Sequence, residues 1–106
     1  MCKEDHLLGR RQRPSQASFA LSTVSQPVAA FARDRAAIIF DPPSAGTVTL
    51  SLLDPAAAGI GLTLRSTDPP LILNVIQHGG LVTAAWRAVA SAGTPTFAVF
   101  ESYLPL

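Results

Sequence analysis

The residues that could perform chemistry are few and scattered along the 106-residue chain. His78 and Asp68, with one of the many serines, could form a nucleophilic triad, because such sites are assembled in space and not in sequence. However, His78 stands beside Gly79-Gly80, a setting typical of a turn. Asp41, Asp54 and Asp68 each precede proline, and at a turn such a carboxylate caps nearby amides. These residues therefore favour turn structure over acid–base or nucleophilic chemistry.

Motifs for phosphate binding, ester hydrolysis and metalloprotease chemistry are missing from the sequence. There is no Gly-rich loop followed by Lys, no G-x-S-x-G elbow and no H-E-x-x-H. Cys2 is the single cysteine and lies near His6, but His78 is distant and the spacings of zinc sites are missing. We expect a protein that is not an enzyme and that holds no metal or cofactor.

Aromatic residues gather near the C-terminus, and they suggest a possible binding strip for sugars or bases. The four residues are Trp86, Phe97, Phe100 and Tyr103. Packing in the core and at its rim is the alternative role for these rings. Arg87 follows Trp86 and so faces the opposite side of a strand, where it could pair with Glu101 or reach a partner.

The composition is poor in charge and the charge is unevenly distributed. Charged residues make up 14% of the chain, where roughly 25% is typical. The stretch 36–106 contains only six of them: Asp41, Asp54, Arg65, Asp68, Arg87 and Glu101. A free monomer usually spreads charge over about 25–35% of its surface, so we expect a partner to cover much of this one. A monomer coated with Ser and Thr is the alternative.

Nucleic acid and membrane partners are not indicated. The net charge is only +1, whereas nucleic-acid-binding domains show a clustered basic face. The run Arg10-Arg11-x-Arg13 could touch a phosphate, but a short solvated tail is the simpler interpretation. The charge-free run 69–86 contains Pro69-Pro70 and Gly79-Gly80 and so does not predict a transmembrane helix.

Chain patterning predicts an irregular N-terminal arm over residues 1–18 and one β-domain over residues 19–106. Short apolar segments separated by Gly, Pro, Asp and Ser are typical of a sandwich. We expect strands at 19–24, 35–40, 47–52, 60–64, 71–76, 81–89 and 96–101. About seven strands and no amphipathic helix predict an all-β fold, an antiparallel sandwich that is jelly-roll-like or Ig-like.

Three segments carry the most specific expectations. Thr47–Leu52 alternates strictly, so one face packs and the other is polar without charge. Leu71–Ile76 is apolar on both sides apart from Asn74, which predicts a strand buried on both faces. The last two strands, joined through Ser91–Thr94, are expected to form a hairpin. We expect the faces around Thr47–Ser51 and Leu71–Ile76 to be covered by a partner.

The order of these segments resembles the small β-sandwich structural proteins of tailed bacteriophages, such as capsid decoration and head–tail accessory proteins. The likeness covers roughly residues 19–101. It is carried by Arg35–Phe40, Gly46–Leu50, Gly59–Leu62, Ala85–Thr94 and the Val-x-Glu at Val99–Glu101.

This resemblance implies a virion structural protein, made in the host cytoplasm, that binds a capsid or tail lattice and forms a homo-oligomer. A carbohydrate- or receptor-binding module of a phage fibre or bacterial surface protein is the alternative. A small hydrolase around His78 and Asp68 is a third hypothesis. The residues expected to bind partners are Arg10, Arg11, Arg13, Trp86, Arg87, Tyr103, Leu104 and Leu106.

Overall fold

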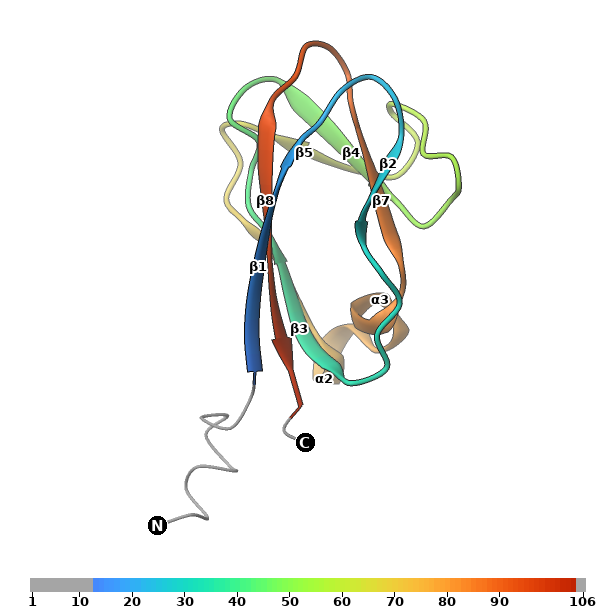
Figure 1. Cartoon of the computed structure of the whole chain (residues 1–106), viewed down its shortest axis with the longest axis vertical. Coiled ribbons are helices and arrows are strands. Elements are labelled where there is room, and N and C mark those ends of the chain that lie inside the picture. Colours follow the sequence, from blue (N-terminus) through green and yellow to red (C-terminus); the bar gives the residue numbers. More distant parts are fainter. Residues whose placement is uncertain (1–12, 105–106) are drawn as a thin grey trace.

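Two antiparallel sheets of four strands each face one another in the computed structural model, which describes residues 13–104 (Figure 1). The strands are β1 (Arg13–Ala20), β2 (Gln26–Ala29), β3 (Arg35–Phe40), β4 (Thr47–Ser51), β5 (Leu62–Arg65), β6 (Leu71–Asn74), β7 (Trp86–Ala90) and β8 (Thr96–Tyr103). Two helices of four residues, α2 (Val75–His78) and α3 (Gly80–Thr83), lie between β6 and β7 in sequence. In Figure 1 they lie at the lower end of the sandwich, where β1 begins and β8 ends.

The strand order identifies the sandwich as a jelly roll. One sheet, here called sheet A, has the order β1-β8-β3-β6, and the other, sheet B, has the order β2-β7-β4-β5. Successive strands therefore pass repeatedly between the two sheets, as in the eight-stranded double Greek key. The predicted all-β antiparallel sandwich is confirmed. Of the two predicted forms, jelly-roll-like and Ig-like, the strand order is that of the jelly roll.

The core lies between the sheets and consists of the alternate residues of each strand whose side chains point inward. Phe40 of β3 is completely buried, and its ring meets the ring of Trp86 from β7 edge-on, with 5.4 Å between centroids. Phe97 of β8 stacks on Phe40 at 6.2 Å. Since Phe40 belongs to sheet A and Trp86 to sheet B, this aromatic contact joins the two layers directly.

The first strand begins earlier than the sequence pattern indicates. Residues 13–18, expected in the arm, pair with β8 from Arg13 opposite Tyr103 onward. Pro14 makes this strand hard to predict from the sequence, because proline cannot donate a hydrogen bond to a neighbouring strand and is confined to edge strands. β1 is such an edge strand. The rest of the predicted arm lies outside the described residues.

The predicted strand at 71–76 is wrong in its length and in its burial. Strand β6 ends at Asn74, whose side chain accepts a hydrogen bond from the backbone N–H of Gln77 and caps α2. Asparagine is among the residues that favour this N-cap position. β6 is an edge strand, and 56% of Ile72 and 93% of Ile76 are exposed.

The predicted C-terminal strand and hairpin also need correction. Residues 80–83 form α3, so the strand expected at 81–89 begins only at Trp86. β7 belongs to sheet B and β8 to sheet A, so the chain crosses between sheets instead of forming a hairpin. A short Gly-containing link is compatible with both connections, and the local sequence does not distinguish them.

The loop between β4 and β5 lies against the outer surface of sheet B. The backbone N–H groups of Leu53 and Gly59 donate to the hydroxyls of Ser51 and Thr49, both at 2.9 Å. Thr49 and Ser51 are consequently 3% and 4% exposed. The alternation predicted for Thr47–Leu52 is confirmed over Thr47–Ser51, but Leu52 lies outside β4 and is 50% exposed. The protein's own loop already covers the polar face.

Gly61 allows this close approach. Its φ of +144° is a conformation that L side chains rarely adopt, and a Cβ there would collide with the carbonyl oxygen of Leu50. Gly46 also has a positive φ, +69°, but open space surrounds its Cβ position. Substituting each glycine in turn therefore distinguishes the energetic cost of the backbone conformation from that of the steric collision.

We predict that Gly61→Ala lowers the free energy of unfolding by about 2–4 kcal/mol, because it adds a collision to an unfavourable backbone conformation. Gly46→Ala, the control, costs about 1 kcal/mol through conformation alone. Urea denaturation followed by the fluorescence of the single tryptophan measures both values. Equal losses in the two variants would contradict the close packing of the loop on β4.

Candidate functional site

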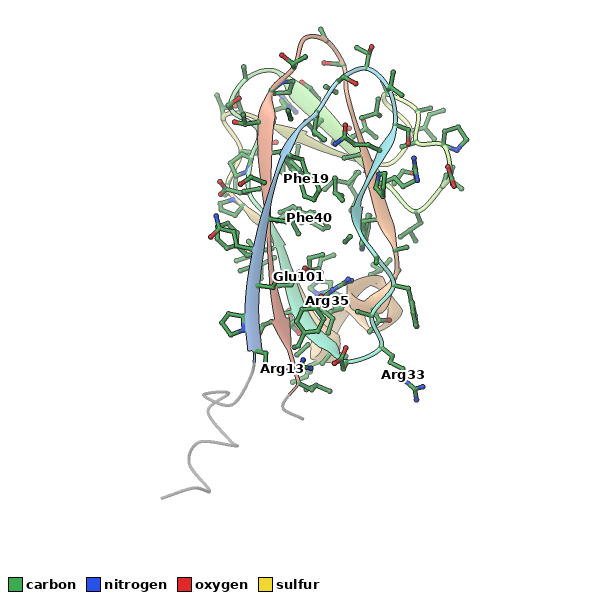
Figure 2. All side chains as sticks on the ribbon, viewed as in Figure 1. Arg13, Phe19, Arg33, Arg35, Phe40 and Glu101 are labelled. Atoms are coloured by element: carbon green, nitrogen blue, oxygen red, sulfur yellow. The ribbon has the colours of Figure 1, made fainter. Side chains whose placement is uncertain are left out.

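An arginine is buried inside the sandwich at the end that carries the short helices. Arg35 of β3 is 1% exposed. Its Nη1 donates to the carbonyl oxygens of Val82 at 2.8 Å and Ala84 at 3.1 Å, and its Nη2 donates to that of Ala30. Its Nε lies 2.9 Å from a carboxylate oxygen of Glu101 on β8, an ion pair without hydrogen-bond alignment. Figure 2 shows Arg35 and Glu101 pointing toward one another between the sheets.

This buried pair is structural in character. Arg35 fastens β3 to α3 and to the loop after β2, while Glu101 supplies the compensating charge from β8. The guanidinium is inaccessible to a ligand, because 99% of the residue is shielded from solvent. Of the two roles considered for Arg87, pairing with Glu101 is wrong, because Glu101 pairs with Arg35 and Arg87 lies near Asp54. An arginine heading an otherwise apolar strand, Arg35–Phe40, was the available sequence signal.

Three of the predicted partner-binding residues come together where β1 begins and β8 ends, but they bind each other. Arg13 donates to the carbonyl oxygen of Leu104 at 3.1 Å and to the carboxylate of Asp34 at 2.6 Å. Its guanidinium also lies 5.5 Å from the centre of the Tyr103 ring, a cation–π geometry. This cluster ties β1 to β8 and to the loop before β3.

Two further predicted partner-binding residues are engaged within the fold. Trp86 is 2% exposed, and its indole N–H donates to the carbonyl oxygen of Leu81 at 2.9 Å. Arg87 donates to the hydroxyl of Ser25 at 2.9 Å and lies 3.4 Å from the carboxylate of Asp54. Trp86 is therefore a core residue, and its expected role in partner binding is wrong. Arg10, Arg11 and Leu106 lie outside the described residues.

His78 and Asp68 each serve their own turn. The Nδ1 of His78 accepts a hydrogen bond from the backbone N–H of Asn74, and the carboxylate of Asp68 accepts one from that of Arg65. Both contacts match the local roles predicted for turn residues. In residues 13–104, no three His, Cys, Asp or Glu side chains gather as metal ligands would. Nor does any helix described there have the length and apolar character needed to cross a membrane.

The outer face of sheet A is the most distinctive exposed surface of the described chain. Register places Ile72 of β6, Ile39 of β3 and Phe100 of β8 side by side in one row, which Gln16 of β1 completes. Ile72 and Phe100 are 56% and 36% exposed. An antiparallel sheet normally presents polar side chains on its solvent face, so this apolar row is unusual.

Strands β1, β3, β6 and β8 contribute no charged side chain to this outer face; the nearest charge is Asp41, one residue past β3, at its edge beside Ser18 and Ala98. Alternation of side chains assigns to it Pro14, Gln16, Ser18, Ala20, Ala37, Ile39, Ile72, Asn74, Thr96, Ala98, Phe100 and Ser102. A groove of about 220 Å³ lies on it, lined by Pro14, Ser15, Ala37, Ile39, Phe100, Glu101 and Ser102. We call these twelve residues the neutral face. The sequence predicted partner-covered surfaces around Thr47–Ser51 and Leu71–Ile76. The second contributes Ile72 and Asn74 to the neutral face, whereas the protein's own loop covers the first.

A second apolar surface lies beside the loop between β4 and β5. The groove there measures about 350 Å³, and Leu52, Leu53, Ile60, Leu62 and Leu81 line its mouth. Leu50 and Trp86 form its inner wall. This groove is wide, open and almost wholly apolar.

Comparisons with known proteins support the fold and go no further. No protein-family model matches the chain, and no curated protein matches it. A solved chain from Bacillus endospore appendages, described as a novel family of disulfide-linked pili, is similar in structure with a TM-score of 0.53. The match covers 90% of this chain and 88% of that one at 9% sequence identity, so the likeness is one of fold.

We predict that Arg35→Met lowers the free energy of unfolding by about 3–5 kcal/mol, because it leaves the carboxylate of Glu101 buried without its partner. Three carbonyl groups lose their donor as well. Arg33→Met is the control, since Arg33 is exposed and points away from the body (Figure 2); it should change stability by less than about 0.5 kcal/mol. Chemical denaturation measures both, and similar values for the two variants would contradict the role of the buried pair.

Proposed function

We propose that this protein is a structural subunit that works by packing against other proteins in a regular assembly. The observation that carries the proposal is the neutral face, an exposed sheet surface whose strands carry no charged side chain and that has an apolar row through its centre. Exposed apolar patches of this kind mark interaction surfaces. Contact between apolar side chains and water is unfavourable, so an uncharged, partly apolar partner surface that displaces this water stabilises the complex.

The setting that we propose is a virion, in which the chain would be a capsid decoration or head–tail accessory subunit. The order of strand segments that resembles such phage proteins supports this setting, and jelly rolls are frequent among viral capsid domains. The fold likeness to an endospore pilus protein suggests a fibre as a second setting. In both settings the role of the subunit is to pack and not to catalyse.

The alternative of a carbohydrate-binding module loses its main support. The aromatic strip that suggested it depended on Trp86 and Tyr103. Trp86 is buried, and Arg13 lies over the ring of Tyr103. Of the four rings in that strip, Phe100 is left at the surface, between Ile39 and Gln16.

We predict that the full chain associates reversibly, and that about 1 M NaCl leaves the association unchanged or strengthens it. Uncharged contacts are not screened by salt, whereas ion pairs at a surface are. Sedimentation velocity at low and high salt, with electron microscopy of the associated species, measures this. A monomer at every concentration would contradict the proposal. So would an assembly that dissociates in salt, because its contacts would be ionic.

A further inference from the structure

We propose that the neutral face packs against the neutral face of a second copy of this chain, sheet on sheet. The proposal rests on the assembly role proposed above and names the partner of that surface. It commits to a symmetric contact in which both copies contribute β1, β8, β3 and β6 of sheet A.

Charge is the first reason to expect a copy of the same face. A partner that brought Lys, Arg, Asp or Glu over Ile39, Ile72 and Phe100 would bury these charges without a counter-ion, which is costly. The complement of an uncharged face is another uncharged face with an apolar centre. This chain carries one, flanked by Gln16, Asn74 and other small polar groups that can form hydrogen bonds at its rim.

Shape is the second reason. Two sheets pack face to face about 10 Å apart, with a small angle between their strands. A sheet surface therefore fits another copy of itself. The apolar groove beside Leu52 and Leu81 is lined mainly by the loop between β4 and β5 and by α3, and it offers no regular sheet surface. On the opposite side of the sandwich, the chain's own loop covers Thr49 and Ser51.

The size of the face sets the strength of the contact. β1 and β8 contain eight residues each, β3 six and β6 four. At strand spacings of about 4.8 Å and rises of about 3.4 Å per residue, the face measures about 400 Å². Two copies that pack face to face bury about 800 Å² in total if each face is treated as flat, and projecting side chains add to this area. The total is close to the roughly 1,000 Å² from which specific interfaces begin. We therefore expect weak, reversible pairing.

The test compares lysine substitutions on and off the face. Phe100→Lys and Ile72→Lys place a charge in the apolar row, whereas Ile76→Lys places one on α2, at a residue that is even more exposed. Sedimentation velocity of each full-length variant from about 1 μM to about 1 mM measures the association constant. We expect at least a tenfold weaker association for the two face variants and an unchanged constant for Ile76→Lys.

A charge-swap mixture tests whether the contact is symmetric. Phe100→Lys and Phe100→Glu should each associate poorly alone, because like charges meet across the contact. Mixed together, they should associate more strongly, since opposite charges then lie within about a Debye length, roughly 8 Å. Thermal unfolding curves confirm that each variant is folded.

The outcomes separate the two proposals. Association that Phe100→Lys and Ile72→Lys leave unchanged would overturn the face-to-face contact and leave the assembly role standing. Association that the face variants abolish, but that the charge-swap mixture does not restore, would overturn the symmetric arrangement. A wild-type chain that stays monomeric to about 1 mM would overturn both proposals.

Discussion

The buried ion pair between Arg35 and Glu101 is the interaction on which the sandwich most depends. Backbone carbonyls of α3 and of the loop after β2 point into the interior, and buried carbonyls need donors. Arg35 supplies those donors to Ala30, Val82 and Ala84, and Glu101 balances its charge. A hydrophobic side chain could fill the same volume but could not satisfy these groups. The pair thereby connects sheet A, through α3, to the strand that carries Trp86 and so to sheet B.

When the two sheets pack together, each keeps one outer face, and these two outer faces differ. On sheet B the loop between β4 and β5 folds back, so that the hydroxyls of Thr49 and Ser51 meet backbone amides of the same chain. On sheet A, Ile72 and Phe100 of the neutral face are 56% and 36% exposed. The loop therefore covers the polar side chains of β4 on sheet B, whereas the apolar row of sheet A remains in contact with water. This asymmetry is the physical basis of the assembly role proposed here.

Sequence reasoning predicted the local features and missed those that depend on distant partners. Thr47–Ser51 could be predicted because strict alternation is a local signal, and the all-β fold follows from several such segments. The end of β6 at Asn74 depended on a side-chain cap. The placement of β7 and β8 in separate sheets, like the pairing of Arg35 with Glu101, depended on residues far apart in sequence. The charge deficit indicated a covered surface, but only the fold shows that the loop covers sheet B and leaves sheet A open.

The most direct test of the central claim is hydroxyl-radical footprinting of the full chain at concentrations below and above its association. The reactive side chains Phe100, Ile39 and Ile72 lie on the neutral face, and Ile76 and Val24 are exposed elsewhere. The account predicts that association protects the first three several-fold and leaves the other two as reactive as before. Equal reactivity of Phe100 in the free and associated protein would contradict it.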